Sequence, residues 1–184
     1  MASKPSLKPR KRPSGKILGS AKAFQQAAKL MEKNPNGPGT KLEDDRLAMP
    51  YIANYAFCCE LAIKSIEVRH KDIKSKKQRN LESSSEGMTV SIRVPEHDLK
   101  KTHNLKNLFA GLHNMNKKAI KEQFKTITGY ELEKLLNCCK NYFEEARYNS
   151  ERSHNCYDLT RLKILADGLI ESIETLGHTG LAIK

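Results

Sequence analysis

Apolar residues recur at helical spacing in almost every periodic segment of this chain. In the segment that begins near Tyr130 they fall three or four residues apart, at Leu132, Leu135, Leu136, Cys139, Phe143 and Ala146. Residues with this spacing share one face of an α-helix, and that face is buried against other helices. A strand-like alternation occurs only weakly, at 88–94, where a lone strand would have no partner. The sequence therefore predicts an all-α protein, an antiparallel bundle of five to six helices.

The same spacing places the helices along the chain. We expect them at 21–33, 50–70, 103–112, 117–127, from about 130 to beyond Arg147, and at 156–176. Pro50 suits the first turn of the second helix. Asn155 suits the N-terminal cap of the last helix, and Gly177 its end.

The helix expected at 50–70 has a wide apolar stripe and a polar remainder. We expect the apolar side chains to face the core and the polar ones to face solvent. The apolar set is Tyr51, Ile52, Tyr55, Cys58, Cys59, Ala62, Ile63 and Ile66, and the polar set is Asn54, Glu60, Lys64 and Glu67.

The positive charge of the chain is concentrated in two segments. Of the net charge of +12, residues 1–31 carry +8 with no acid, and residues 69–79 carry +5, so the rest is close to neutral. Clustered basic residues suit contact with phosphate groups, although a solvated charged loop is the alternative for the second segment. The residues expected to contact nucleic acid are Lys8, Arg10, Lys11, Arg12, Lys74, Lys76, Lys77 and Arg79.

Composition divides the chain into a domain with two tails. Residues 1–20 are basic and contain Pro and Ser, so we expect a disordered tail. Its role stays open between phosphate contact, nuclear import, solubilisation and an organelle transit peptide, against which its three prolines argue. A helical domain is expected at 21–176, with a long basic loop at 71–94, and a second tail at 177–184.

The cysteines and histidines do not form a metal-ligand pattern. The five cysteines are odd in number and include two adjacent pairs, which suits neither a disulfide framework nor a Cys-x-x-Cys site. His103 has no second ligand at a matching spacing, and we expect it to be exposed or to cap its helix. We therefore expect reduced cysteines that fill the core, no metal and no cofactor. No apolar run has the length of a membrane span, and a cytoplasmic location is expected.

Three segments of the chain carry motifs of a known family in the family's order. They are 55–65 (YAFCCELAIKS), 103–112 (HNLKNLFAGL) and 143–148 (FEEARY), which is followed by His154. The second segment is similar to the family's His-x-Leu-x-x-Leu-Phe-x-x-Leu motif. Together, over roughly residues 46–176, they resemble the HEPN family (higher eukaryotes and prokaryotes nucleotide-binding domain), which is a helical bundle.

The resemblance implies an active site at Arg147 and His154. Active members carry an Arg and a His on one helix with four to six residues between them, and here six residues lie between Arg147 and His154. In one helix the two would lie two turns apart and face one side. The resemblance implies metal-independent RNA cleavage, in which the His moves a proton and the Arg stabilises the phosphate. Tyr148 after the Arg is similar to the Arg-Tyr branch of the family.

The resemblance also implies a biological role and partners. These are a toxin or antiviral defence function, an RNA substrate, a homodimer, and a nucleotidyltransferase-type antitoxin. The alternative is that Arg147 pairs with Glu144 or Glu151 at helical spacing and that His154 borders a turn. The chain would then be a non-catalytic module that binds nucleic acid or a protein partner.

Overall fold

The computed structural model describes residues 14–33, 45–66, 102–148 and 156–178, and within them it contains helices and no strand. The seven helices of these segments are α1 (Gly15–Glu32), α2 (Asp45–Ile66), α3 (Leu105–Ala110), α4 (Asn114–Thr128), α5 (Leu132–Cys138), α6 (Tyr142–Arg147) and α7 (Leu159–His178). The predicted all-α bundle is confirmed. The loop expected at 71–94, with its weak strand pattern, lies outside the described residues.

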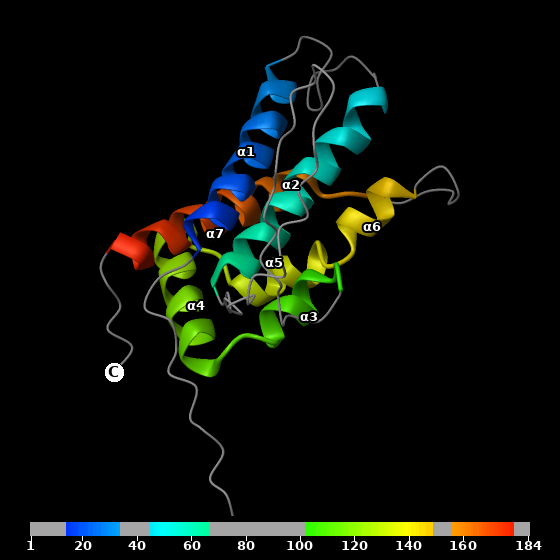
Figure 1. Cartoon of the computed structure of the whole chain (residues 1–184). Helices are drawn as coiled ribbons and strands as arrows, with labels where there is room; N and C mark the ends of the chain where they lie inside the picture. Colours follow the sequence, from blue (N-terminus) through cyan, green and yellow to red (C-terminus); the bar gives the residue numbers. More distant parts are fainter. Residues whose placement is uncertain (1–13, 34–44, 67–101, 149–155, 179–184) are drawn as a thin grey trace, which may run out of the picture.

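The helices enclose one apolar core. α1 and α2 lie side by side and run in opposite directions, and α7 passes behind them (Figure 1). α7 also packs against α4 and α5, while α6 and α3 pack against α2. The largest fully buried side chains come from five of these helices, α2, α3, α4, α5 and α7, and include Tyr55, Leu108, Phe124, Leu136 and Leu165. The core therefore joins segments that are far apart in the sequence.

The apolar stripe predicted for α2 is confirmed, since all eight of its residues are buried. The prediction that Glu60 faces solvent is wrong, because only 1% of it is exposed. A buried carboxylate is tolerated only where charged or hydrogen-bonding partners replace water. Lys64 and His103 fill that role for Glu60. Asn54 and Lys64 are half-buried, and Glu67 lies outside the described residues.

Three helices begin earlier than predicted: α1, α2 and, by three residues, α4. α1 begins at Gly15, so the tail expected at 1–20 ends sooner; residues before 14 lie outside the described part. The N–H of Ser14 donates to the carbonyl of Ser65, which fixes the start of α1 against the end of α2. α2 begins at Asp45, so Pro50 lies inside this helix and not in its first turn. Little more than one turn precedes Pro50, so few hydrogen bonds depend on the N–H that proline lacks.

The long helix expected from about 130 is divided into α5 and α6. The break at 139–141 meets the start of α3, where the N–H of Leu105 donates to the carbonyl of Lys140 and the amide of Asn104 donates to Asn141. These contacts use backbone and side-chain groups that a continuous helix would direct elsewhere. The break therefore comes from the packing of α3.

The ends of the last helix also differ from the prediction. α7 begins at Leu159, and the carboxylate of Asp158 caps it by accepting a hydrogen bond of 2.9 Å from the N–H of Arg161. Asn155, which we expected to be the cap, lies outside the described residues. Gly177 lies within α7, which continues to His178.

A polar cluster joins α1, α2 and α7 at the end of α1. The carboxylate of Glu32 accepts hydrogen bonds from the hydroxyls of Tyr51 (2.8 Å) and Tyr55 (3.2 Å) and from Nζ of Lys163 (2.8 Å). Burial acts to raise the pKa of Glu32, but the bonds from Lys163 and the two tyrosines together outweigh it and hold this pKa below its usual value of 4.5.

We expect Glu32→Gln to lower the free energy of unfolding by about 1 kcal/mol at neutral pH. Because the pKa of Glu32 is lowered by folding, its stabilisation is full above the unfolded value near 4.5 and is lost as the pH falls through the folded value. The difference in free energy of unfolding between wild type and variant, measured with urea, should therefore be smaller at about pH 3 than at pH 7. The exposed Glu122→Gln serves as control. A difference that is the same at both pH values would contradict the assigned role of the Glu32 charge.

Candidate functional site

Arg147 is the one predicted catalytic residue that the structure describes. It is the last residue of α6 and is exposed, and Tyr148 follows it as the C-terminal cap. The helix expected to carry both Arg147 and His154 therefore ends at Arg147. His154 lies outside the described residues, as do all eight residues predicted to contact nucleic acid. The pairing of Arg147 with His154 stays a prediction.

The guanidinium of Arg147 lies against two aromatic rings. Its Cζ is 5.4 Å from the ring centre of Phe143 and 5.3 Å from that of Tyr148. These distances allow cation–π attraction. Within the described segments Arg147 forms no ion pair, so the pairing with Glu144 that we considered is not found; Glu151 lies outside. No carboxylate of the described segments therefore neutralises the guanidinium of Arg147. Its neighbour Tyr148 is 48% exposed.

The ring of Phe143 fixes this part of α6 on the rest of the bundle. It stacks on Phe57 of α2 with ring centres 4.9 Å apart and an interplanar angle of 17°. Phe57 in turn meets the edge of Phe24 of α1 at 4.7 Å. The imidazole of His103 also contacts Phe143, at 5.0 Å. Phe143 therefore links Arg147 to α2, and its ring is contacted by both Arg147 and His103.

Three charged or titratable side chains, Glu60, Lys64 and His103, form what we call the Glu60 cluster. Oε1 of Glu60 lies 2.5 Å from Nζ of Lys64, and Oε2 lies 2.9 Å from Nδ1 of His103. His103 does not cap α3, because the side chain of the next residue, Asn104, accepts the capping bond from the N–H of Asn107. The capping role considered for His103 is not found, and its side chain, which is 40% exposed, binds a buried carboxylate from another helix.

The sequence contains an indication of this cluster, although helical periodicity alone does not reveal it. Glu60 lies between apolar neighbours on a helix whose stripe is unusually wide, and Lys64 follows it by one turn. An acid in that position must find partners if the helix is buried. The partner in the other segment, His103, is 43 residues away, and nothing local identifies it.

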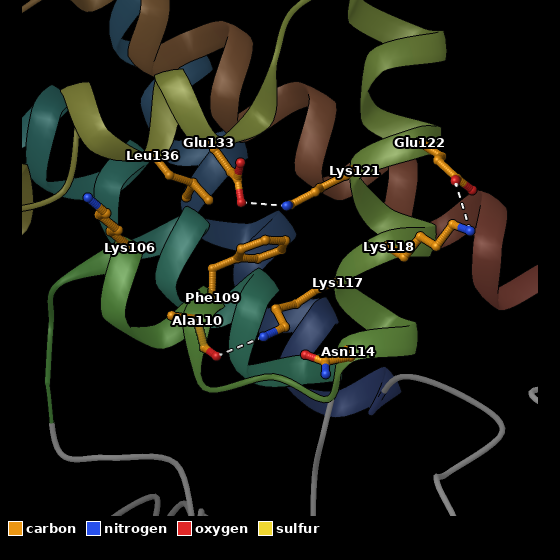
Figure 2. A pocket seen from close by; sticks show the side chains of 10 residues that line it. All are labelled: Lys106, Phe109, Ala110, Asn114, Lys117, Lys118, Lys121, Glu122, Glu133 and Leu136. Atoms are coloured by element: carbon orange, nitrogen blue, oxygen red, sulfur yellow. Dashed lines mark hydrogen bonds and ion pairs between the residues drawn. The ribbon is translucent and has the colours of Figure 1, made fainter.

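A second charged surface is a groove between α3, α4 and α5, with a volume of about 730 Å³. Figure 2 shows the Phe109 ring on its floor with lysines around it. The groove is lined by Phe109, Ala110 and Leu136, by Lys106, Lys117, Lys118 and Lys121, and by Asn114, Glu122 and Glu133. We call it the lysine groove.

The lysine groove keeps a net positive charge. Lys118 and Lys121 pair with Glu122 and Glu133, while its other two lysines donate to uncharged oxygens (Figure 2). Four cations therefore face two carboxylates. The sequence did not predict this surface. Its four lysines are spread over two helices, whereas the excess positive charge of the sequence lies in two dense basic segments.

The cysteines are free, and their positions divide them into two groups. Cys58, Cys59 and Cys139 are buried in the core, as predicted, whereas Cys138 is half-buried and Cys156 is exposed. Burial raises the pKa of the Cys58 thiol to about 12, and it raises the pKa values of Cys59 and Cys139 as well. These three thiols stay protonated and act as apolar side chains at neutral pH.

Within the four described segments, no group of three or more His, Cys, Asp or Glu side chains could hold a metal ion. None of the helices described is both long and apolar enough to cross a membrane.

Comparison of the chain with protein-family models, with curated proteins and with solved structures gave no match. The HEPN resemblance therefore depends on the three motifs quoted above and stays a prediction.

Proposed function

We propose that this chain is an RNA-binding protein of the HEPN type that cleaves RNA without a metal ion, through Arg147 and His154. The observation that carries the proposal is the exposed guanidinium of Arg147, which has no carboxylate partner in the described segments and lies against Phe143 and Tyr148. A guanidinium in this state is free to bind a phosphate through two hydrogen bonds. The exposed ring of Tyr148 offers a surface on which a base can stack.

The proposed reaction needs a proton-transfer group and a cation. His154 moves a proton to or from the attacking 2′-hydroxyl or the leaving oxygen, and Arg147 stabilises the charge on the phosphate in the transition state. We further propose, from the resemblance, a homodimer in which two such sites share a cleft. A toxin or antiviral role beside a nucleotidyltransferase-type antitoxin belongs to the same proposal.

The distribution of charge supports RNA as the ligand. The chain carries +12 overall, and the lysine groove adds a positive surface within the bundle itself. Contacts between lysines or arginines and phosphates release counterions, so binding through them weakens steeply as salt rises. We propose that the basic residues of 1–31 and 69–79 supply most of these contacts.

A second candidate function is a non-catalytic module that binds nucleic acid or a protein partner. The end of α6 at Arg147 favours it, because the helix that was expected to carry both catalytic residues ends at the first of them. In this case Arg147 and Tyr148 bind the ligand, and no bond is broken.

A metal-free assay separates the two candidates. Purified protein and its His154→Ala variant are incubated with mixed cellular RNA in EDTA. We expect cleavage by the wild type and a rate at least about 100-fold lower for the variant. Circular dichroism and thermal unfolding check that the variant keeps its fold. Binding of RNA by both proteins without cleavage by either would favour the non-catalytic module.

A further inference from the structure

The Glu60 cluster fixes which nitrogen of His103 is basic. A carboxylate accepts hydrogen bonds and cannot donate them, so Nδ1 of His103 carries the hydrogen in its 2.9 Å contact with Oε2 of Glu60. The lone pair of the neutral ring is then on Nε2. Lys64 donates to the other oxygen of Glu60, which leaves Oε2 directed at His103.

The exposure of the three residues differs in a way that suits proton transfer. The side chain of Glu60 is 1% exposed and that of Lys64 is 18% exposed, whereas that of His103 is 40% exposed. The orienting carboxylate is therefore buried, and the imidazole it orients reaches solvent. A carboxylate placed in this way fixes the ring and stabilises the imidazolium that forms when Nε2 accepts a proton.

His103 also contacts the same aromatic ring as the phosphate-binding cation of the proposed function. The imidazole is 5.0 Å from the ring centre of Phe143, and Cζ of Arg147 is 5.4 Å from the same centre. One aromatic ring, fixed against α2 by Phe57, thus contacts both a proton acceptor and a guanidinium that has no carboxylate partner among the described residues. This juxtaposition joins α2, α6 and the residue that precedes the cap of α3.

We infer that Nε2 of His103 takes the proton from the attacking 2′-hydroxyl of RNA, and that Glu60 and Lys64 position it. The inference rests on the proposed function, and it assigns to His103 the step that the HEPN resemblance alone would give to His154. The 2′-oxygen forms a bond to phosphorus as its proton moves to Nε2, and the bond from phosphorus to the 5′-oxygen breaks. The leaving 5′-oxygen takes a proton from water. The products are a 2′,3′-cyclic phosphate and a 5′-hydroxyl, and His103 returns its proton to solvent.

The variant His103→Asn tests the inference. The Asn amide can donate to Glu60 from nearly the position of Nδ1, so the link between α2 and α3 is kept, but no nitrogen is left to accept a proton. In EDTA we expect cleavage of an RNA oligonucleotide to fall by about 100-fold or more, with RNA binding at fixed salt unchanged. The matched control is His113→Asn, at the cap of α4, where Asn is also a good cap. We expect this control to cleave as the wild type does.

Glu60→Gln tests the positioning role through the pH profile of cleavage. Among the described residues, the charged groups of this site are Glu60, which contacts His103, Lys64, which contacts Glu60, and Arg147, which lies on the Phe143 ring that His103 also contacts. Without the carboxylate, an imidazolium beside Lys64 and Arg147 is less stable, so we expect the acid limb of the rate profile to move to lower pH. A purely structural role for Glu60 would lower the rate and leave the position of that limb unchanged.

The outcomes separate this inference from the proposed function. Absence of cleavage by the wild type overturns both. Cleavage by the wild type and equally by folded His103→Asn overturns the inference alone. Loss of cleavage in His103→Asn, with an unchanged thermal midpoint, unchanged RNA binding and a fully active His113→Asn control, supports His103 as the proton acceptor. Should His103→Asn fail to fold, the Glu60→Gln profile decides, and an unmoved acid limb overturns the inference.

Discussion

Substitution of Arg147 by Ala is expected to lower RNA cleavage by about 100-fold to 1,000-fold, because it removes the cation that stabilises the phosphate in the transition state. The fold should remain intact, since the guanidinium is exposed and contacts only the rings of Phe143 and Tyr148 among the described residues. Cleavage rates in EDTA, together with a thermal unfolding curve, measure both effects.

The same variant should also change the salt dependence of RNA binding. If Arg147 contacts one phosphate, the slope of log affinity against log salt should become shallower by about one. The matched control is Arg161→Ala, which removes an equal charge from an arginine that is paired with Asp158. Equal losses of binding in the two variants would mean that Arg147 acts only through net charge. Arg147→Lys should restore part of the binding and less of the cleavage, because Lys lacks the planar fork of donors.

We expect Gly168→Ala to lower the free energy of unfolding by about 1–3 kcal/mol. Gly168 lies in α7 where that helix packs on α4. A Cβ placed there would be 2.5 Å from Cε2 of Phe124 and 2.5 Å from Cγ2 of Thr128. The Phe124 ring is fully buried and has little room to move. The added methyl group therefore forces α4 and α7 apart, which outweighs the gain of about 0.5–1 kcal/mol that Ala brings to a helix interior.

Gly19→Ala is the matched control for this prediction. Gly19 lies in α1, is exposed, and nothing lies within 4 Å of a Cβ built on it. This variant should therefore be more stable than wild type by about 0.5–1 kcal/mol. Urea unfolding measures whether the free energy of unfolding falls in Gly168→Ala and rises in Gly19→Ala. A stabilised Gly168→Ala would contradict the close packing of α4 on α7.

Helical periodicity predicted the faces of the helices more accurately than their ends. The apolar stripe of α2 is buried throughout, because three- and four-residue spacing is a direct consequence of the geometry of one helix. The starts of α1 and α2 were placed too late. The expected start of α2 depends on Pro50, and that of α1 depends on its first closely spaced apolar residues. The contact between Ser14 and Ser65 that fixes the start of α1 joins two distant segments, so no local pattern predicts it.

The break between α5 and α6 could not be predicted from periodicity. Cys139 and Phe143 keep the apolar rhythm across 139–141, so the local pattern favours one continuous helix. The hydrogen bonds from Leu105 and Asn104 to this turn come from another part of the chain. They also decide where Arg147 lies, because α6 takes its direction from the turn.

The sequence by itself determined the all-α class, most of the buried faces and the location of the excess charge, and it singled out Arg147. Only the tertiary structure decided that Glu60 is buried, that His103 and Lys64 are its partners, and that His103 and Arg147 contact the same Phe143 ring. The physical reason is the distance along the chain over which each property acts. Periodicity and charge are properties of a single segment, whereas a buried ion cluster exists only where packed helices bring residues from distant segments within hydrogen-bond distance.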